Sequence, residues 1–139
     1  MALRQGVTPR YAIGVAGRQG VDAPALTELV RLTASRWGVA AQSARLVAPE
    51  RPEDRAAFED AAAAFGVPLV FLPMAELRAR AGDVLSHSPR VAAMFGVGSV
   101  AEALALIGAG ADSRLLGPRV ATARLTCAIA QASGEGDGP

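Results

Sequence analysis

The chain has 139 residues and 51% hydrophobic residues, which is the size and apolar content of one globular domain. Its 14 basic residues are all arginine and balance 13 acidic residues, so the net charge at pH 7 is +1. A charge this small excludes the strong field that attracts nucleic acid or an anionic membrane, and we expect neither as a partner.

The first predicted unit is a strand, a turn and a helix. Residues 1–10 are polar and without periodicity, and we expect them to be a flexible lead-in. Residues 11–15 predict a short buried strand that runs into the glycine-rich turn 14–20. Asp22 is a typical N-cap for the following helix, whose apolar residues recur at helical spacing until Gly38 ends it.

Further elements follow in the first half of the chain. Residues 44–47 predict a second strand, and residues 58–65 predict a helix that ends at Gly66. Residues 67–72 are apolar throughout, which is typical of a strand covered on both faces. A short helix is expected over residues 74–80.

Two helices with capped starts are predicted in the second half. Ser88 and Pro89 are a typical N-cap and first residue of a helix that runs through Phe95. Ser99 and Glu102 have the spacing of a capping box that begins another helix. In such a box, the Glu102 carboxylate reaches back to the N–H of Ser99.

The last predicted elements are two strands, over residues 114–116 and 125–129. Their connection is too short for a crossover helix, so they should pair antiparallel. Residues 132–139 should form a disordered tail. Together the elements predict one α/β domain over residues 11–131, a three-layer sandwich with a mixed, largely parallel sheet of about five strands and a C-terminal β-hairpin.

The glycine-rich turn, with Gly14, Gly17 and Gly20, is the first candidate binding site. Glycines after a buried strand let a ligand approach the backbone, and the start of the next helix favours an anion. The spacing matches neither the dinucleotide fingerprint nor the P-loop, so a purely structural turn is the alternative. Arg18 and Gln19 would project at the carboxyl edge of the sheet, where open α/β folds bind ligands.

His87 and Glu102 are the candidate catalytic residues, and each has a structural alternative. His87 is the only histidine, and histidine is the side chain that titrates near neutrality by default, but without a visible partner an exposed loop histidine is the favoured interpretation. Glu102 would either bind or activate a substrate, or complete the capping box. Ser88 is expected to cap a helix rather than act as a nucleophile, and with Ser99 it joins the candidate substrate-binding residues.

Arg119, Thr126 and Cys127 complete the candidates. Arg119 follows a Gly-Pro turn and is able to clamp a carboxylate with two hydrogen bonds, or to lie solvated at the turn. Thr126 and Cys127 alternate in a strand, and we expect Cys127 to be buried and inert. It is the only cysteine, so no intramolecular disulfide or cysteine-based zinc site is expected. We also expect a cytoplasmic location, because the first residues lack the apolar core of a signal peptide.

Several segments carry a shared pattern in a fixed order. They are Ser88-Pro89-Arg90-Val91, Gly96-Val97-Gly98-Ser99-Val100-Ala101-Glu102-Ala103, Leu115-Leu116-Gly117-Pro118-Arg119 and Thr126-Cys127-Ala128-Ile129-Ala130. Together they resemble the CobE family of cobalamin biosynthesis, which is similar to the C-terminal domain of CbiG. The resemblance covers about residues 11–131. At the N-terminal turn the family pattern resembles Gly-Ile-Gly-Cys-Arg-Arg-Gly, from which this chain departs at Ala16, Gly17 and Gln19.

The resemblance implies a role in making the corrin ring of vitamin B12. The implied ligand is a precorrin or corrinoid tetrapyrrole, and the leading hypothesis is a carrier or accessory factor of the aerobic route. The alternatives are a CbiG-like hydrolase that opens a precorrin lactone, and a small nucleotide-binding module. No cofactor or metal is expected, since any cobalt arrives with the ligand. Other cobalamin-biosynthesis enzymes are candidate partners, and a homodimer is left open.

Overall fold

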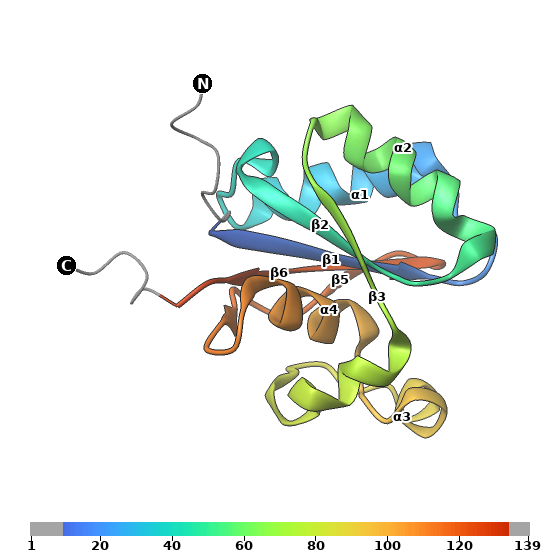
Figure 1. The fold of residues 1–139 in the computed structure, drawn as a ribbon, viewed down its shortest axis with the longest axis vertical. Helices are drawn as coiled ribbons and strands as arrows, with labels where there is room; N and C mark the ends of the chain where they lie inside the picture. Colours follow the sequence, from blue (N-terminus) through green and yellow to red (C-terminus); the bar gives the residue numbers. More distant parts are fainter. Residues whose placement is uncertain (1–9, 134–139) are drawn as a thin grey trace.

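A six-stranded sheet with helices on both faces forms the core of residues 10–133, the part of the chain that the computed structural model describes (Figure 1). The strands lie in the order β3-β2-β1-β6-β4, and β5 also pairs with β6. Their bounds are β1 Tyr11–Gly17, β2 Ala44–Pro49, β3 Leu69–Leu72, β4 Arg114–Leu115, β5 Val120–Ala121 and β6 Leu125–Gln131. The predicted lead-in and most of the predicted tail, residues 1–9 and 134–139, lie outside the described residues.

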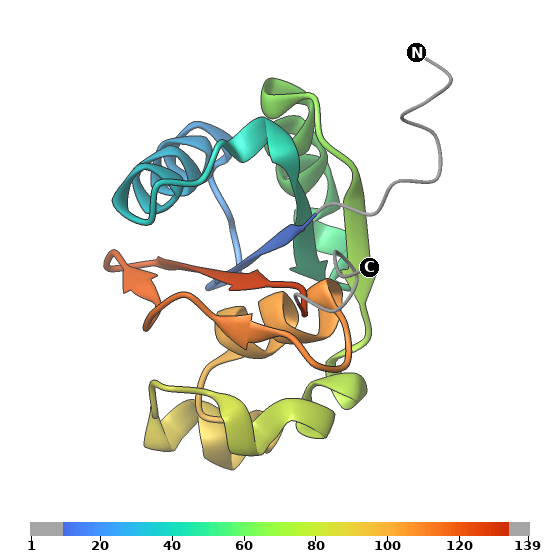
Figure 2. The same cartoon turned by 90° about the vertical axis from the view of Figure 1, so that its left-hand side faces the viewer.

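The helices form layers on the two faces of the sheet (Figure 2). Helices α1 and α2 cover one face, α4 covers the other, and η4 and α3 lie on the outer side of α4. Their bounds are α1 Ala23–Arg36, α2 Arg55–Phe65, α3 Pro89–Phe95 and α4 Val100–Ala109, with 3-10 segments η2 Ala41–Ser43, η3 Pro52–Asp54 and η4 Met74–Asp83. The predicted α/β sandwich with a mixed sheet is confirmed.

The sheet is mixed because β6 runs against its neighbours. Strands β1, β2 and β3 are parallel, as helical crossovers between them require. Strand β6 pairs antiparallel with β1, β4 and β5. The predicted antiparallel pairing of the last two expected strands is confirmed, although β4 pairs with Ala130 and Gln131, just beyond the predicted residues 125–129. The sequence did not indicate β5, because two residues are too few to show a period.

Strand β3 is the edge strand of the parallel half, and its four residues are only half-buried. The expectation that this apolar segment is covered on both faces is therefore wrong, because periodicity does not show which strand lies at an edge. Pro68 and Pro73 flank β3, and the Arg55 guanidinium lies over the Phe71 ring at 4.4 Å from its centroid. Flanking prolines and a covering charge discourage pairing with another chain.

The predicted helix starts are confirmed by their side-chain caps. Asp22, Ser88 and Ser99 each accept a hydrogen bond from the backbone N–H three residues further on, at 2.9, 3.3 and 3.3 Å. These caps satisfy N–H groups that have no partner inside the helix. The predicted helix over residues 74–80 is instead the 3-10 segment η4, which has non-helical backbone angles at Arg80.

Helix α4 lies unusually close to the sheet, because the side chains between them are small. The sheet presents alanines to this helix, among them Ala12 and Ala128. A Cβ atom at Gly14 would overlap the carbonyl oxygen of Ala101 and lie 2.7 Å from the N atom of Ala105. Helix α4 is buried on nearly all sides, as its apolar sequence requires. Within residues 10–133, no single helix is long and apolar enough to cross a membrane.

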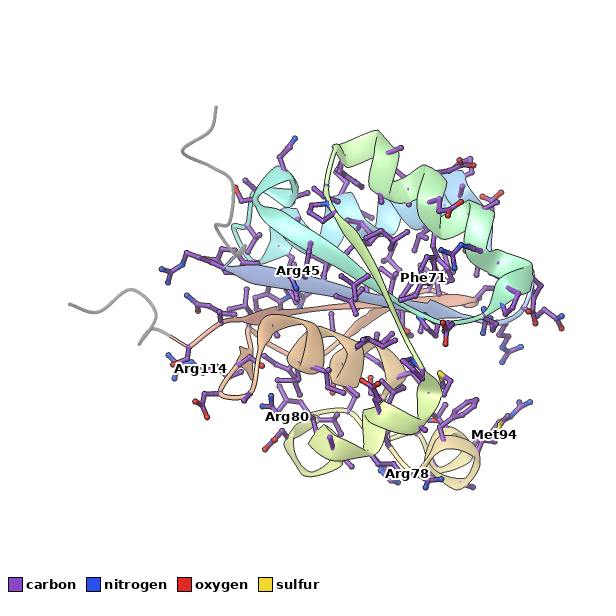
Figure 3. The ribbon with its side chains drawn as sticks, viewed as in Figure 1. Arg45, Phe71, Arg78, Arg80, Met94 and Arg114 are labelled. Atoms are coloured by element: carbon purple, nitrogen blue, oxygen red, sulfur yellow. The ribbon has the colours of Figure 1, made fainter. Side chains whose placement is uncertain are left out.

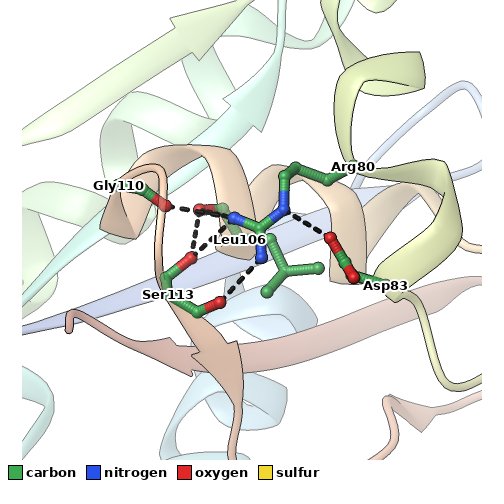
Figure 4. Close-up of polar contacts among 5 residues, drawn as sticks. All are labelled: Arg80, Asp83, Leu106, Gly110 and Ser113. Carbon is green, nitrogen blue, oxygen red and sulfur yellow. Dashed lines mark hydrogen bonds and ion pairs between the residues drawn. The ribbon is translucent and has the colours of Figure 1, made fainter.

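The far end of α4 is fixed by Arg80 (Figure 4). Its guanidinium donates a hydrogen bond to the carbonyl oxygen of Gly110 at 3.1 Å. It donates two more to Ser113, to Oγ at 3.0 Å and to the carbonyl oxygen at 2.7 Å. It also pairs with Asp83 at 2.8 Å. Figure 3 shows Arg114 at the same end of the molecule, where a shallow depression of about 200 Å³ lies beside Arg80. Since the Arg80 guanidinium is fully occupied, we assign this arginine to holding the helix end.

The contact at Gly14 predicts a large difference between two glycine-to-alanine variants. Gly14→Ala should lower the free energy of unfolding by about 3 kcal/mol, because the added methyl forces α4 away from the sheet. Gly82→Ala is the control: no atom lies within 4 Å of its Cβ position, and its effect should stay within about 1 kcal/mol. Urea unfolding followed by circular dichroism measures both, and equal stabilities would contradict the prediction.

Candidate functional site

The glycine-rich turn lies at the carboxyl edge of the sheet, as predicted, but the two N–H groups where it meets α1 are already occupied. Asp54 Oδ1 accepts hydrogen bonds from the N–H groups of Gly20 at 3.1 Å and Val21 at 3.0 Å. Asp54 Oδ2 accepts two more from the Arg51 guanidinium, at 2.9 and 2.5 Å. A carboxylate of the chain itself thus takes the place of the expected anion, and these two N–H groups are not free for a phosphate.

Asp54 is 4% exposed. Burial by itself raises the pKa of its carboxyl, but the N–H of Val21, the Arg51 guanidinium and the N–H of Gly20 together outweigh burial and hold the pKa below the ordinary value of 3.8. No motif in the sequence distinguishes Asp54. Its position before α2 suggests an ordinary helix cap, yet its side chain makes no hydrogen bond to that helix.

The three glycines of the turn differ in their surroundings. Gly14 is buried beneath α4, which leaves it no surface for a ligand. At Gly17 a Cβ atom would lie 2.6 Å from the Leu125 side chain, so the β5–β6 turn packs against it. Gly20 has a φ of +87°, and the nearest atom to a Cβ at this position is a guanidinium nitrogen of Arg124, at 3.7 Å. Only Gly20 and the exposed Arg18 and Gln19 therefore present the turn to a ligand.

A shallow cleft of about 250 Å³ opens between this turn and the β5–β6 turn. The N–H of Arg18 donates to the carbonyl of Arg124 at 3.1 Å, and the Arg124 guanidinium donates to the carbonyl of Gln19 at 3.0 Å, so the two turns are tied together. Among the described residues, the Arg18 guanidinium makes no hydrogen bond or ion pair. The cleft is lined by Arg18, Gly20, Val21, Asp22, Ala25, Thr122, Ala123, Arg124 and Leu125. Arg124 was not predicted, because nothing local distinguishes it from a solvated turn arginine.

A second cluster of candidates surrounds Glu102, whose side chain is completely buried. Its Oε1 accepts from the N–H groups of Leu85 at 2.7 Å and Ser86 at 2.9 Å. Its Oε2 accepts from Ser86 Oγ at 2.6 Å and from the N–H of Arg119 at 2.8 Å. The prediction that Glu102 reaches back to Ser99 is wrong: Ser99 caps the N–H of Glu102, but the carboxylate is used by residues outside the helix.

The other predicted site residues lie near this cluster. His87 is exposed, as expected for a loop histidine, and a Cβ atom at Gly98 would lie 2.8 Å from its Nδ1. The N–H of Ser88 donates to the carbonyl of Gly98 at 2.9 Å. Thr126 is half-buried in β6, opposite Ala16 near the same edge of the sheet. Apart from Thr126, the structure therefore brings the candidates of the second half together around the first turn of α4.

Cys127 is completely buried, as predicted. Burial raises the pKa of its thiol to about 12, and a hydrogen bond with the Thr33 side chain offsets only part of this effect. Such a thiol is not a nucleophile near neutral pH. Among residues 10–133, no group of three or more His, Cys, Asp or Glu side chains is placed to hold a metal ion.

Known proteins match this chain in sequence. The family model of the cobalamin synthesis G C-terminus matches residues 11–130. A curated relative, Protein CobE from a Sinorhizobium species, is 37% identical over 94 residues. The match covers 67% of this chain and 61% of the relative, so the chain spans less than two thirds of that protein's length.

Solved structures match the fold over nearly the whole chain. The crystal structure of CobE, a protein from the cobalamin (vitamin B12) biosynthetic pathway, has a TM-score of 0.79 and 26% identity, and the match covers 93% of this chain and 96% of that one. The cobalamin biosynthesis protein chiG from Agrobacterium tumefaciens has a TM-score of 0.71 and 30% identity. That match covers 88% of this chain and 98% of the other.

Asp54 makes stability depend on pH. Its pKa is lowered in the native state and ordinary in the unfolded state, so the carboxylate stabilises the fold fully above about pH 5, and this contribution is lost as the pH falls through the native pKa. Asp54→Asn should cost about 1.5–3 kcal/mol at neutral pH. In urea unfolding, this deficit should shrink as the pH falls below 4, roughly the ordinary pKa of an aspartate. Asp60→Asn, at an exposed position of α2, is the control; a deficit of Asp54→Asn that does not change with pH would contradict the prediction.

Cys127 should be protected from thiol reagents in the native protein. At pH 8 the folded chain is expected to react with an aromatic disulfide reagent only as fast as it unfolds, because the thiol is buried and protonated. In denaturant the single thiol should react at once and completely. Rapid reaction of the folded protein would show that the β6 face near Thr33 opens to solvent.

Proposed function

The chain belongs to the family of the cobalamin synthesis G C-terminus and is a cobalamin biosynthesis protein of the CobE type, and from this premise we propose that it binds a precorrin or corrinoid intermediate as a carrier or accessory factor. Family membership over residues 11–130 is the observation that carries the proposal. The proposed place of binding is the cleft between the β1–α1 turn and the β5–β6 turn.

The cleft has the chemistry that such a ligand requires. A corrinoid intermediate is a flat, largely apolar ring with carboxylates on its rim. Arg18 and Arg124 line a cleft that also contains Val21 and Leu125, and Arg18 has a guanidinium with no protein partner among the described residues. Arginine binds a carboxylate through two parallel hydrogen bonds. At about 250 Å³ the cleft is smaller than pockets that enclose a ligand, so it suits one carboxylate-bearing side chain of the ring.

The alternative, a hydrolase that opens a precorrin lactone, receives less support. A general base has to lie within hydrogen-bond reach of the substrate proton. Glu102 is completely buried, and four donors occupy its two oxygens. His87 is exposed, and no hydrogen bond within residues 10–133 orients its ring. A carrier needs neither residue as a base, and its expected partners are the enzymes that receive the ligand.

A nucleotide-binding module receives the least support. It would use the N–H groups of the glycine-rich turn to hold a phosphate. Asp54 already occupies the N–H groups of Gly20 and Val21, and its negative charge would repel a phosphate at that position.

Binding is tested by titration with hydrogenobyrinic acid, a metal-free corrin with free carboxylates, followed by its absorbance. The folded protein should shift the spectrum and saturate at one ligand per chain. Arg18→Ala should raise the Kd at least tenfold, because a charge-assisted hydrogen bond contributes about 1.5–3 kcal/mol. Arg90→Ala, on an exposed position of α3, is the charge-matched control and should bind like the unchanged chain. The absence of any spectral shift with folded protein would refute the proposal.

A further inference from the structure

Glu102 joins two surface segments that are far apart in the sequence. Leu85 and Ser86 approach its carboxylate from one segment, and the Arg119 N–H approaches it from the other, 17 residues after Glu102. All four donors are uncharged, and within residues 10–133 no arginine or histidine side chain pairs with this carboxylate. Burial of a carboxylate is unfavourable unless hydrogen bonds compensate for the lost water. The compensation here comes from three backbone N–H groups and the Ser86 hydroxyl of the two segments, which Glu102 thereby fixes in place.

The backbone at Arg119 is held from three directions. Glu102 accepts its N–H at 2.8 Å. Pro118 precedes it and restricts the turn. Gly117 is buried directly beneath the Trp37 ring, where a Cβ atom would overlap the indole. The Arg119 guanidinium, by contrast, makes no hydrogen bond or ion pair with any described residue.

Rigid backbone and free guanidinium distinguish Arg119 from most structural arginines of the fold. The guanidinium groups of Arg51 and Arg80 donate hydrogen bonds to carboxylates and carbonyls of the chain. A fixed backbone with an unused charged group is what a preorganised anion-binding residue requires, because little further ordering is needed when the ligand arrives.

The position of Arg119 relative to Arg18 follows from the strand register. Arg18 continues β1 beyond the pair of Gly17 with Leu125, and Arg119 immediately precedes Val120, which pairs with Cys127 across β6. Two strand spacings and about four residues along the strands separate them, which is roughly 15 Å between Cα atoms. Carboxylates on two sides of a tetrapyrrole ring have a comparable span, so the two guanidinium groups are placed to contact different carboxylates of one ring.

We propose that Arg119 is a second carboxylate-binding residue, that Glu102 is the positioning residue which holds it there, and that the site therefore selects corrinoids with free carboxylates on two sides of the ring. This inference rests on the proposed function and specifies its ligand class. A corrinoid whose carboxylates have been converted to amides loses the charge that both arginines recognise.

The test compares Arg119→Ala, Glu102→Gln and the double variant in titrations with hydrogenobyrinic acid. Arg119→Ala should raise the Kd at least tenfold. Glu102→Gln keeps the size of the side chain but turns an NH₂ group toward either the Arg119 N–H or the Leu85 and Ser86 N–H groups, and it should raise the Kd several-fold. Because Glu102 acts through Arg119, Glu102→Gln should cause no further loss when Arg119 is already alanine. Arg114→Ala, in the other strand that pairs with this side of β6, is the matched control and should bind normally.

A second measurement uses the amide derivative of the same corrin. The unchanged protein should bind it at least tenfold more weakly than the free acid, and Arg119→Ala should reduce that preference. If Glu102→Gln fails to fold, as shown by circular dichroism, the Arg119→Ala and amide results decide. Failure of the unchanged protein to bind hydrogenobyrinic acid refutes the proposed function itself. Normal binding by Arg119→Ala, or fully additive losses in the double variant, overturns only this inference.

Discussion

The close approach of α4 to β1 determines how the candidate site is built. Gly14 has no side chain, and the residues around it on this face of the sheet are alanines. The backbone of α4 therefore contacts the sheet directly. This depth sets the position of Glu102 in the first turn of α4, where it accepts hydrogen bonds of 2.6–2.9 Å from two separate segments. A helix seated even one methyl group further out would carry the carboxylate beyond hydrogen-bond distance of at least one of them.

Two buried carboxylates, Asp54 and Glu102, each order a loop through backbone N–H groups. Both are nearly or completely inaccessible to solvent, whereas the guanidinium groups of Arg18 and Arg119 have no protein partner among the described residues. The net charge of +1 therefore does not describe the local charge that a ligand contacts. These two carboxylates are buried inside the fold, whereas the two guanidinium groups lie where a ligand can bind them. A strong overall field is unnecessary for a small anionic ligand that contacts the arginines directly.

Features with local causes were predicted from the sequence, and features with distant partners were not. Asp22 caps its helix with an N–H three residues away, so the pattern is visible in a short window. Asp54 binds the N–H of Gly20, 34 residues earlier, and Glu102 binds Leu85, 17 residues earlier. Both aspartate and glutamate stand at positions typical of helix starts, and the sequence predicts capping for Glu102 with good reason. Tertiary contacts provided stronger partners than the helix did.

The shape of the cleft bears on how a carrier would work. A pocket that encloses its ligand buries most of the ligand surface, and release is then slow unless the protein rearranges. A cleft of about 250 Å³ at the edge of the sheet would leave most of a bound tetrapyrrole exposed, and the affinity would then rest on a few arginine contacts at the rim of the ring. An enzyme with its own groups for the exposed face could then bind the ring before the arginines release it. In the proposed carrier, arginines at the rim of the ring and an exposed ring face would thus allow both specific binding and transfer to the next protein.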